Sequence, residues 1–444
     1  MASRLALNNI IDGANSDTRH NSLNPLYAVL FSVGFALFYS PAVYALPMLM
    51  FRVWQVVTCA VCVIATIIYL AECKIDAKWV SFSCFFFVYY LYSSLVNDSN
   101  GWMVSILYNT IRGFGFASLV CLGLSKTPRE CILGYIVGGL VMCGVNYVTF
   151  VIFKDSSSGM RLNTTLQNWY FLGHDNETVF YYLPLSAACF FYGAKYSRRF
   201  KAVGFIVLVL TIVMFVYLKS AAAMTVSVCF AVFVCFALAR DGSRKGKWAF
   251  LSMRQTVFIG LFLAAAIVVL AGSDLVISAV SSYGKAVTFG FRQTIWGNSI
   301  EALSNSPLFG VGFNDETTRV AMLSFDHSHN VVLQVLFQSG FFGFILFLFM
   351  CVSNTGGSLL RISIDRSEIH ILSACMFLCL VAGCVDYYPD LFPQFFPMVL
   401  SSFMVHSKSK SIGHHSTLLL PLTSSSDDQS RKLSLISDSV LRLD

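Results

Sequence analysis

Apolar stretches follow one another along most of this chain, between residues 25 and 405. A helix of about 20 apolar residues crosses a bilayer core about 30 Å thick. A window of that length finds about twelve such stretches. Their approximate bounds are 26–48, 51–71, 79–97, 102–123, 131–153, 178–194, 202–218, 221–239, 256–276, 330–352, 369–387 and 391–405. The sequence therefore predicts an all-α, polytopic membrane protein with about 12 transmembrane helices.

The composition excludes an ordinary water-soluble domain. Charged residues are 12% of the chain and hydrophobic residues 56%, whereas a soluble domain has about 25% charged residues. Nearly all of the 14 cysteines lie inside apolar stretches, so we interpret them as small packing residues. The net charge of +7 does not indicate a nucleic-acid partner, because the basic residues follow the connections between spans.

These basic residues predict an orientation in the membrane. Alternate connections are rich in lysine and arginine, including "KYSRRFK" at 195–201 and "RDGSRKGK" at 240–247. The remaining connections carry far fewer lysines and arginines. Because positively charged loops stay in the cytoplasm, we expect a multi-pass membrane protein with both termini in the cytoplasm.

Five regions follow from the spans and the loop charges. The two long outer segments are 154–177 and 277–329, and long structured loops on one face usually carry function. The expected regions are a cytoplasmic N-terminal segment (1–24), transmembrane helices 1–9 (25–276), a large extracytoplasmic loop with short helices and the candidate catalytic residues (277–329), transmembrane helices 10–12 (330–405) and a disordered cytoplasmic tail (406–444).

The large loop contains a predicted amphipathic helix followed by a turn. Helical spacing puts four residues on one face: Arg292, Trp296, Ile300 and Leu303. Pro307 is expected to end this helix, and Gly310 and Gly312 indicate a turn. We expect the helix to lie at the outer membrane surface, with Arg292 at the height of the lipid headgroups.

The stretch "FDHSHNVVLQVLFQSGFFG", residues 325–343, begins with charged and polar residues and continues as an apolar helix. His329 and Gly340 are about 1,100° apart on a helix, so they would share a face, with Gly343 about 40° away. The two glycines would let another backbone or a thin ligand come close. His329 would stand at the outer mouth of this helix.

The spacing of these residues resembles a known family. His329 and Asn330 are followed after nine residues by Gly340 and after two more by Gly343. This pattern, with Arg292, Trp296 and "PLFGVGF" before it, is similar to the signature of the O-antigen ligase and O-antigen polymerase family.

The resemblance implies a glycosyltransferase that uses a lipid carrier. Such an enzyme moves a glycan from undecaprenyl diphosphate to an acceptor hydroxyl on the outer face of the cytoplasmic membrane. The resemblance therefore also implies a location in a bacterial cytoplasmic (inner) membrane. The implied partners are this donor, a glycan or lipid acceptor, the membrane and other polysaccharide assembly proteins. No cofactor, metal or nucleotide sugar is implied.

The chemistry of this transfer suits the residues that carry the resemblance. Arg292 is the first candidate for the leaving diphosphate, because guanidinium binds phosphate bidentately. His329 is the candidate base for the acceptor hydroxyl, and Asn330 would orient it or cap the helix. Trp296 and His327 are further candidates for substrate binding. His327 and His329 lack a third ligand at useful spacing, so no metal site is predicted.

Further cations are candidates for binding diphosphate or glycan. The family has an arginine where this chain has Ala221, and Lys219 would supply that charge or merely extend to the membrane interface. Arg161 lies in the other long outer segment. Arg112 lies inside a span, where it would contact the diphosphate from below or pair with an acid such as Asp386.

Other functions remain alternatives. A flippase or transporter of lipid-linked glycans would have charged residues lining several spans, and a membrane scaffold would leave Arg292 and His329 unexplained. Within the family, a polymerase that builds surface polysaccharide is favoured over a ligase that attaches glycan to lipid A-core. The reason is that the outer loops lack a strong basic cluster for a phosphorylated lipid A-core.

Overall fold

The structure is a computed structural model, and it is almost wholly helical where it describes the chain. The described residues are 23–42, 45–101, 103–153, 169–174, 176–241, 247–271, 286–356, 363–384 and 392–403. The chain divides into two compact units, residues 1–403 and 404–444, and all described residues belong to the first. The predicted tail at 406–444 lies outside them.

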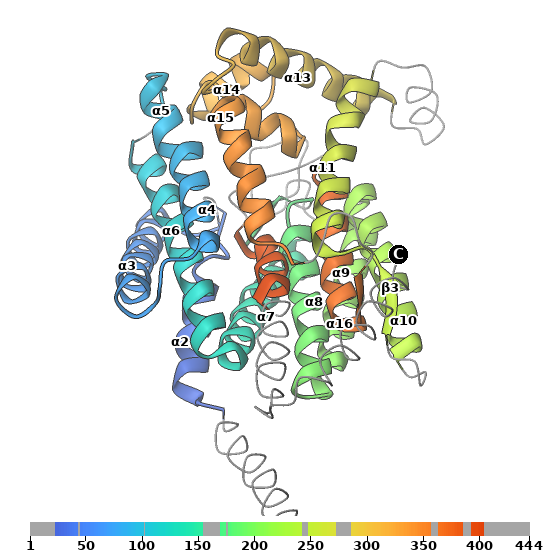
Figure 1. Cartoon of the computed structure of the whole chain (residues 1–444). Helices are drawn as coiled ribbons and strands as arrows, with labels where there is room; N and C mark the ends of the chain where they lie inside the picture. Colours follow the sequence, from blue (N-terminus) through green and yellow to red (C-terminus); the bar gives the residue numbers. More distant parts are fainter. Residues whose placement is uncertain are drawn as a thin grey trace, which may run out of the picture. The chain divides into compact units, whose positions relative to one another are not determined.

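The helices have bounds close to most of the predicted spans (Figure 1). They are α2 Pro25–Ala36, α3 Met48–Glu72, α4 Ala77–Phe86, the π-helix η1 Phe87–Tyr92, α5 Ser93–Val96, α6 Met103–Lys126, α7 Pro128–Phe153, α8 Val179–Lys195, α9 Arg199–Leu218, α10 Ala221–Asp241, α11 Met253–Leu270, α13 Ala286–Asn305, α14 Glu316–Leu323, α15 Val331–Ser353, α16 Ser367–Ala382 and the 3-10 helix η2 Phe392–Phe395. Helical residues continue from 396 to 403.

Two short antiparallel ribbons interrupt this helical plan. Strand β1 (Trp169–Tyr170) pairs with β2 (Gly173–His174), and β3 (Lys247–Phe250) pairs with β4 (Ser363–Arg366). In the second ribbon Lys247 is opposite Arg366. Both ribbons connect helices and neither contributes a layer, so the protein remains a helical one.

Eight of the described helices are long and apolar enough to cross a membrane, and α2 and α16 are shorter apolar helices. Several of these helices expose large apolar side chains, such as Leu49 at 77% and Val269 at 82%. Such surfaces suit contact with lipid tails. A polytopic, helical membrane protein is therefore confirmed, while twelve spans remain a prediction.

The prediction was wrong for the first span. It expected one helix over 26–48, whereas α2 has 12 residues and ends at Ala36. Pro41 and Pro47 explain the difference, because proline has no N–H to donate and its ring clashes with the preceding helical turn. The chain leaves the helix at Leu37 and starts α3 only after Pro47, the N-cap residue of α3.

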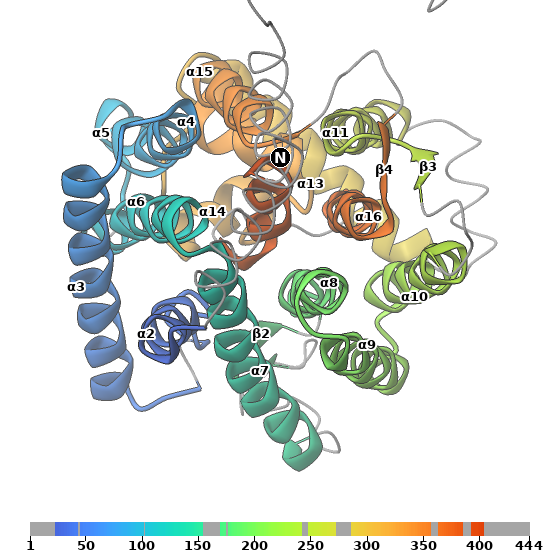
Figure 2. The same ribbon diagram turned by 60° about the horizontal axis from the view of Figure 1, so that its bottom comes forward.

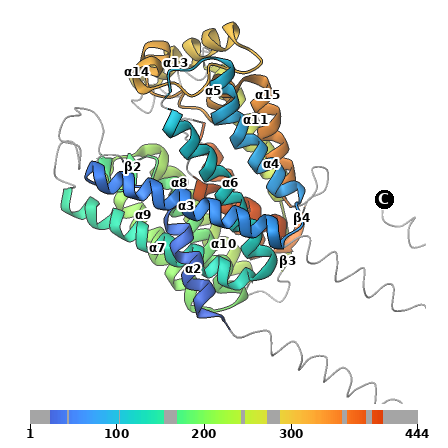
Figure 3. The same ribbon diagram turned by 90° about the vertical axis from the view of Figure 1, so that its left-hand side faces the viewer.

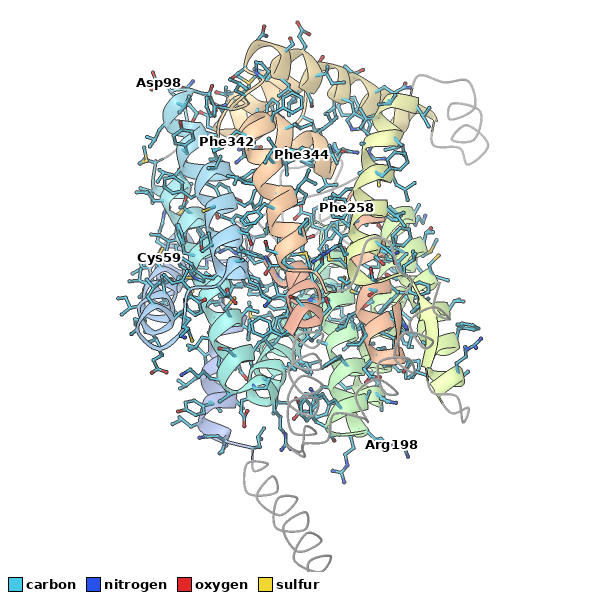
Figure 4. The ribbon with its side chains drawn as sticks, in the orientation of Figure 1. Cys59, Asp98, Arg198, Phe258, Phe342 and Phe344 are labelled. Carbon is cyan, nitrogen blue, oxygen red and sulfur yellow. The ribbon has the colours of Figure 1, made fainter. Side chains whose placement is uncertain are left out.

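The connections expected on the outer side gather at one end of the helices, which we call the α13 end. Figure 1 shows α13 lying across this end. Hydrogen bonds join several of these connections there: Ala42 to Phe171, Asn97 to Phe309, and Ser220 to Asn176. Figure 4 places Asp98 at this end and Arg198, from one of the basic connections, at the opposite end. The predicted alternation of the connections therefore agrees with the fold.

Small residues let the helices pack closely near the first span. A Cβ on Gly134 would lie 2.3 Å from Cβ of Phe31, and one on Gly115 would lie 2.3 Å from Cβ of Cys62. Helix α2 thus packs against α7, and α3 packs against α6 (Figure 2). Figure 3 shows α3 steeply inclined to α15. This arrangement leaves the short helix α2 between longer neighbours.

Candidate functional site

Helix α15 is broken in its middle at Gly340. The backbone angles there are φ 64° and ψ −166°, a conformation that only glycine adopts without strain. A Cβ at this position would lie 2.3 Å from the carbonyl carbon of Leu308. The prediction that another backbone comes close to Gly340 is confirmed, and that backbone is the loop that follows α13.

This loop occupies the break and satisfies its backbone groups. Residues 307–312 exchange four hydrogen bonds with α15: Phe341 N to Pro307 O (2.9 Å), Phe342 N to Leu308 O (3.0 Å), Val311 N to Phe337 O (2.8 Å) and Gly312 N to Gln338 O (3.0 Å). An unpaired backbone group in an apolar surrounding costs several kcal/mol. The predicted turn at Gly310 and Gly312 is confirmed by their φ of 67° and 74°, and it fixes the loop to α15.

The predicted alignment of His329 with the glycines was wrong. Asn330 is the N-cap of α15, so His329 precedes the helix, with a left-handed φ of 51°. The break at Gly340 removes the continuous helix on which the angular argument depended. Gly343 lies in the second half of α15, where a Cβ would fall 1.9 Å from Oγ of Ser339. His329 and the glycines are joined through the loop and α15 and do not share one helical face.

Asp326, His327 and His329 form a compact array just before α15. Nδ1 of His327 lies 2.6 Å from Oδ1 of Asp326, and the ring centres of His327 and His329 are 3.9 Å apart. Phe325 packs against both rings, at 5.2 and 4.4 Å. His327 and His329 are buried. The two imidazoles are therefore shielded from water, while the carboxylate that they adjoin keeps 32% of its side chain exposed.

The charge of Asp326 determines which nitrogen of His327 carries its proton. Burial alone would raise the pKa of Asp326, but the hydrogen bond from His327 lowers it overall, together with the charge of Arg319 and those of His327 and His329 when they are protonated. The carboxylate is therefore ionised near neutral pH and can only accept hydrogen bonds. Nδ1 of His327 must therefore donate to it, which fixes the tautomer of a neutral His327.

Three side chains hold the backbone of this segment. The indole Nε1 of Trp296 donates to Ser328 O at 3.0 Å, and the amide of Ser328 donates to Gln334 Oε1 at 2.9 Å. Nε of Arg319 donates to Asp326 O at 2.7 Å. These bonds are buried or partly buried, so the histidines are positioned before any substrate arrives.

Trp296 and Arg292 lie one turn apart on α13. Trp296 is 2% exposed and packs with Ile295, Leu323, Leu333 and Phe337, so its indole supports the histidine segment from the core. Arg292 is half-buried. The predicted face of this helix was partly wrong, because Ile300 is 50% exposed and Ser299 is buried in its place.

The side chain of Asn330 makes four hydrogen bonds to backbone groups of the protein. Its side-chain oxygen accepts from the amides of Val332 and Leu333. Its Nδ2 donates to Ala264 O in α11 and to Cys384 O after α16. The residue therefore caps α15 and ties three helices together beside His329.

A cavity of about 570 Å³ opens at the α13 end. Its walls come from residues 40–42, α3, α6, residues 172–181 and residues 313–319. Arg112, one of the predicted candidates, lines it together with Arg52 and Arg319. Arg319 also donates to Asp326 O, so this one side chain lies between the cavity and the histidine array.

The other candidate cations are less closely connected to this array. Lys219 is exposed and ends α9 with a left-handed φ of 55°. The next residue, Ser220, donates a hydrogen bond to Asn176, which places this connection at the α13 end. Arg161 and Asp386 lie outside the described residues, so the pairing of Arg112 with Asp386 is untested.

The sequence analysis missed Arg319 and Arg52 as site residues and did not assign a role to Asp326. No spacing rule connects them, because Arg52 is in α3, Arg319 is in α14 and the histidines precede α15. The one available signal was the position of Arg319 within the predicted catalytic loop. Among the described residues no group of three or more His, Cys, Asp or Glu is placed to hold a metal ion.

The fold and the site define a polytopic membrane protein with a polar array at one end of its helices. A protein-family model described as O-antigen ligase matches residues 204–348. These residues include Arg292, Arg319, His329 and the broken helix. This match confirms the resemblance to the O-antigen ligase and polymerase family in that segment and supports an activity of the membrane glycosyltransferase type. No curated protein matches the chain.

Proposed function

We propose that this protein extends a surface polysaccharide by moving a glycan from an undecaprenyl-diphosphate carrier to a hydroxyl of a second lipid-linked glycan. The α13 end would face the outside of the cytoplasmic membrane. The observation that carries the proposal is the array of Asp326, His327 and His329, oriented inside the segment that matches the O-antigen ligase family.

The reaction needs a base and a group that stabilises the leaving diphosphate. The acceptor oxygen forms a bond to the anomeric carbon of the donor while the bond from that carbon to phosphate breaks. The electron pair leaves with the diphosphate, and the proton of the hydroxyl passes to an imidazole. His329 is the proposed base, and the half-buried guanidinium of Arg292 would bind the diphosphate.

Asp326 and His327 would support this base. The ionised Asp326 fixes the proton of His327 on Nδ1, and the neighbouring ring of His329 lies 3.9 Å away, centre to centre. His327 could thus take the proton onward from His329 or stabilise its charged form. General-base help contributes about 10²–10⁴-fold to a rate, and the pinned backbone provides the positioning that such help requires.

The test is complementation of a strain that lacks the gene, with the surface polysaccharide separated by length. The intact protein should restore long chains, and His329→Ala should leave products with a single capped repeat. Full activity of His329→Ala would remove the proposed base. Ile300→Ala, on the exposed face of α13, is the matched control and should behave as the intact protein.

A ligase that transfers finished glycan to lipid A-core is the second candidate, because the matching family model is described as O-antigen ligase. The strain that lacks the gene distinguishes a ligase from a polymerase. Loss of a ligase leaves long chains on the lipid carrier, and that result would contradict the polymerase. A flippase would instead leave the glycan on the inner face of the membrane in the absence of the protein.

A further inference from the structure

Two buried glutamines adjoin each other in the first half of α15. Gln334 and Gln338 are four residues apart, so their side chains lie one turn apart on the same face. They are 6% and 4% exposed, and both lie between the N-cap Asn330 and the break at Gly340. Burying an amide among apolar groups costs free energy unless its polar atoms are paired. Two such residues in an apolar helix therefore indicate a role that an apolar side chain could not fill.

The two amides are part of a chain of three hydrogen bonds. The backbone amide of Ser328 donates to Gln334 Oε1 at 2.9 Å. Nε2 of Gln334 donates to Gln338 Oε1 at 3.4 Å, and Nε2 of Gln338 donates to Tyr89 O at 3.0 Å. Ser328 stands between the two histidines of the array, and Tyr89 lies in η1. The chain thus connects the histidine segment to a helix far away in the sequence.

The two ends of this chain fix the orientation of both side-chain amides. A backbone N–H only donates and a carbonyl oxygen only accepts. Gln334 must therefore turn its oxygen to Ser328 and its nitrogen to Gln338, which in turn must turn its nitrogen to Tyr89 O. Reversing either amide would place two donors or two acceptors opposite each other. The chain therefore has a single arrangement, and a fully paired buried network of this kind is rigid.

The far end of the chain is anchored in a well-packed part of the fold. Helices α4 and α15 lie side by side (Figures 1 and 2), and η1 also contacts α15. Tyr89 O accepts a second hydrogen bond, from Ser93 Oγ at 3.0 Å. The loop that fills the break in α15 reaches the same region, where Phe313 N donates to Ser94 Oγ at 2.9 Å. Short π-helices such as η1 are rare and frequently occur at functional sites.

We propose that Gln334 and Gln338 are positioning residues, which hold the amide of Ser328 and so set the places of the His327 and His329 rings from η1. The consequence for catalysis rests on the proposed function. Trp296 holds the carbonyl of Ser328 and Gln334 holds its amide, so both backbone groups between the histidines are fixed. The glutamines act only through Ser328 and take no part in proton transfer. A misplacement of about 1 Å can cost about 10²-fold in rate.

The first test needs no activity. It measures hydrogen exchange of residues 325–330 by mass spectrometry, with the purified protein in nanodiscs. Methionine is similar in length to glutamine and packs well, but it cannot donate to Tyr89 O. We expect Gln338→Met to speed exchange at 325–330 by about 3–10-fold and to leave residues 344–353 unchanged. Gln338→Asn, one methylene too short to reach both partners, should give the same result and serves if the methionine variant folds poorly.

The matched control is Ser339→Ala. Ser339 is buried next to Gln338, and its hydroxyl donates to Val335 O within its own helix. Its removal therefore disturbs the same part of α15 without interrupting the chain. Exchange at 325–330 should stay as in the intact protein.

The second test separates positioning from substrate binding by measuring kcat and KM of chain extension in lipid vesicles. Gln334→Met and Gln338→Met should each lower kcat by about 10–100-fold and change KM by less than about twofold. The double variant should be no worse than Gln334→Met, because one interruption already disconnects Ser328 from η1. Two independent packing defects would instead multiply their effects.

Several outcomes would overturn the proposal. These are unchanged exchange at 325–330 in Gln338→Met, an equal effect of Ser339→Ala, and multiplied losses in the double variant. Faster exchange with an unchanged kcat would also overturn it, because the histidines would then need no such support. If the intact protein extends no chains while Gln338→Met still speeds exchange at 325–330, the proposed function fails and the support of the histidine segment by the glutamines stands.

Discussion

Nδ1 of His327 lies 2.6 Å from Oδ1 of Asp326, and this bond fixes the proton of the imidazole on one side of the ring. The ring centre of His329 lies 3.9 Å from that of His327. An aspartate that orients a histidine in this way sets its tautomer and stabilises its charged form. In the proposed reaction this pair would set the direction of proton movement.

Replacing Asp326 with asparagine should reduce the rate of glycan transfer. An amide in this place can donate to Nδ1 and select the wrong tautomer of His327. We expect a loss of about 10²–10⁴-fold, measured as the rate of chain extension by purified protein in lipid vesicles. Glu301→Gln, an exposed acid on α13, is the control, and an equal loss there would contradict the special role of Asp326.

The stability of the folded protein should depend on pH through Asp326, and Asp326→Asn should lose this dependence. The pKa of Asp326 is lowered in the folded protein, so its charged form stabilises the fold. That stabilisation is complete above the usual carboxyl pKa of about 3.9 and is lost as the pH falls through the lower folded value. In detergent, the unfolding temperature of the intact protein should be higher than that of Asp326→Asn at both pH 7 and pH 5. The difference should shrink below about pH 4; a constant difference would disagree.

Gly340→Ala should release the loop from the broken helix. The added Cβ would lie 2.3 Å from Leu308 C, at a backbone φ of 64° that alanine avoids. We expect a loss of at least about 1–3 kcal/mol, seen as a lower unfolding temperature and a low yield of folded protein. Gly297→Ala is the control, because nothing lies within 4 Å of its added Cβ and alanine favours helix.

Trp296→Phe should reduce activity more than stability. Phenylalanine keeps most of the buried apolar contact but leaves Ser328 O without its donor. An unpaired buried carbonyl costs about 1–3 kcal/mol, and the histidine segment loses one of its three supports. The measurement compares kcat with the unfolding temperature for this variant and for Ile300→Ala. A fall in stability with kcat unchanged would show that Trp296 acts only in packing.

The candidate site was predictable from the sequence only in part. The spacing of His329, Asn330, Gly340 and Gly343 pointed to a segment that lies within the residues matched by the family model. Arg112 was predicted as a cation inside a span, and it lines the cavity. The arrangement of His329 and Gly340 on one helical face was wrong, because that argument assumed an unbroken helix. His329 precedes the helix in a left-handed conformation. The break at Gly340 is held by contacts with a loop some thirty residues away along the chain.

The sequence by itself determined the membrane character, the approximate places of most spans and the segment that carries the family resemblance. These properties depend on local composition, since a run of apolar residues must leave water wherever it lies. Only the tertiary structure decided that α2 ends early, that residues 307–312 fill the break in α15, and that Arg319 joins the cavity to Asp326. These contacts join residues far apart in the chain, and their energies come from packing and hydrogen bonds that no local pattern encodes.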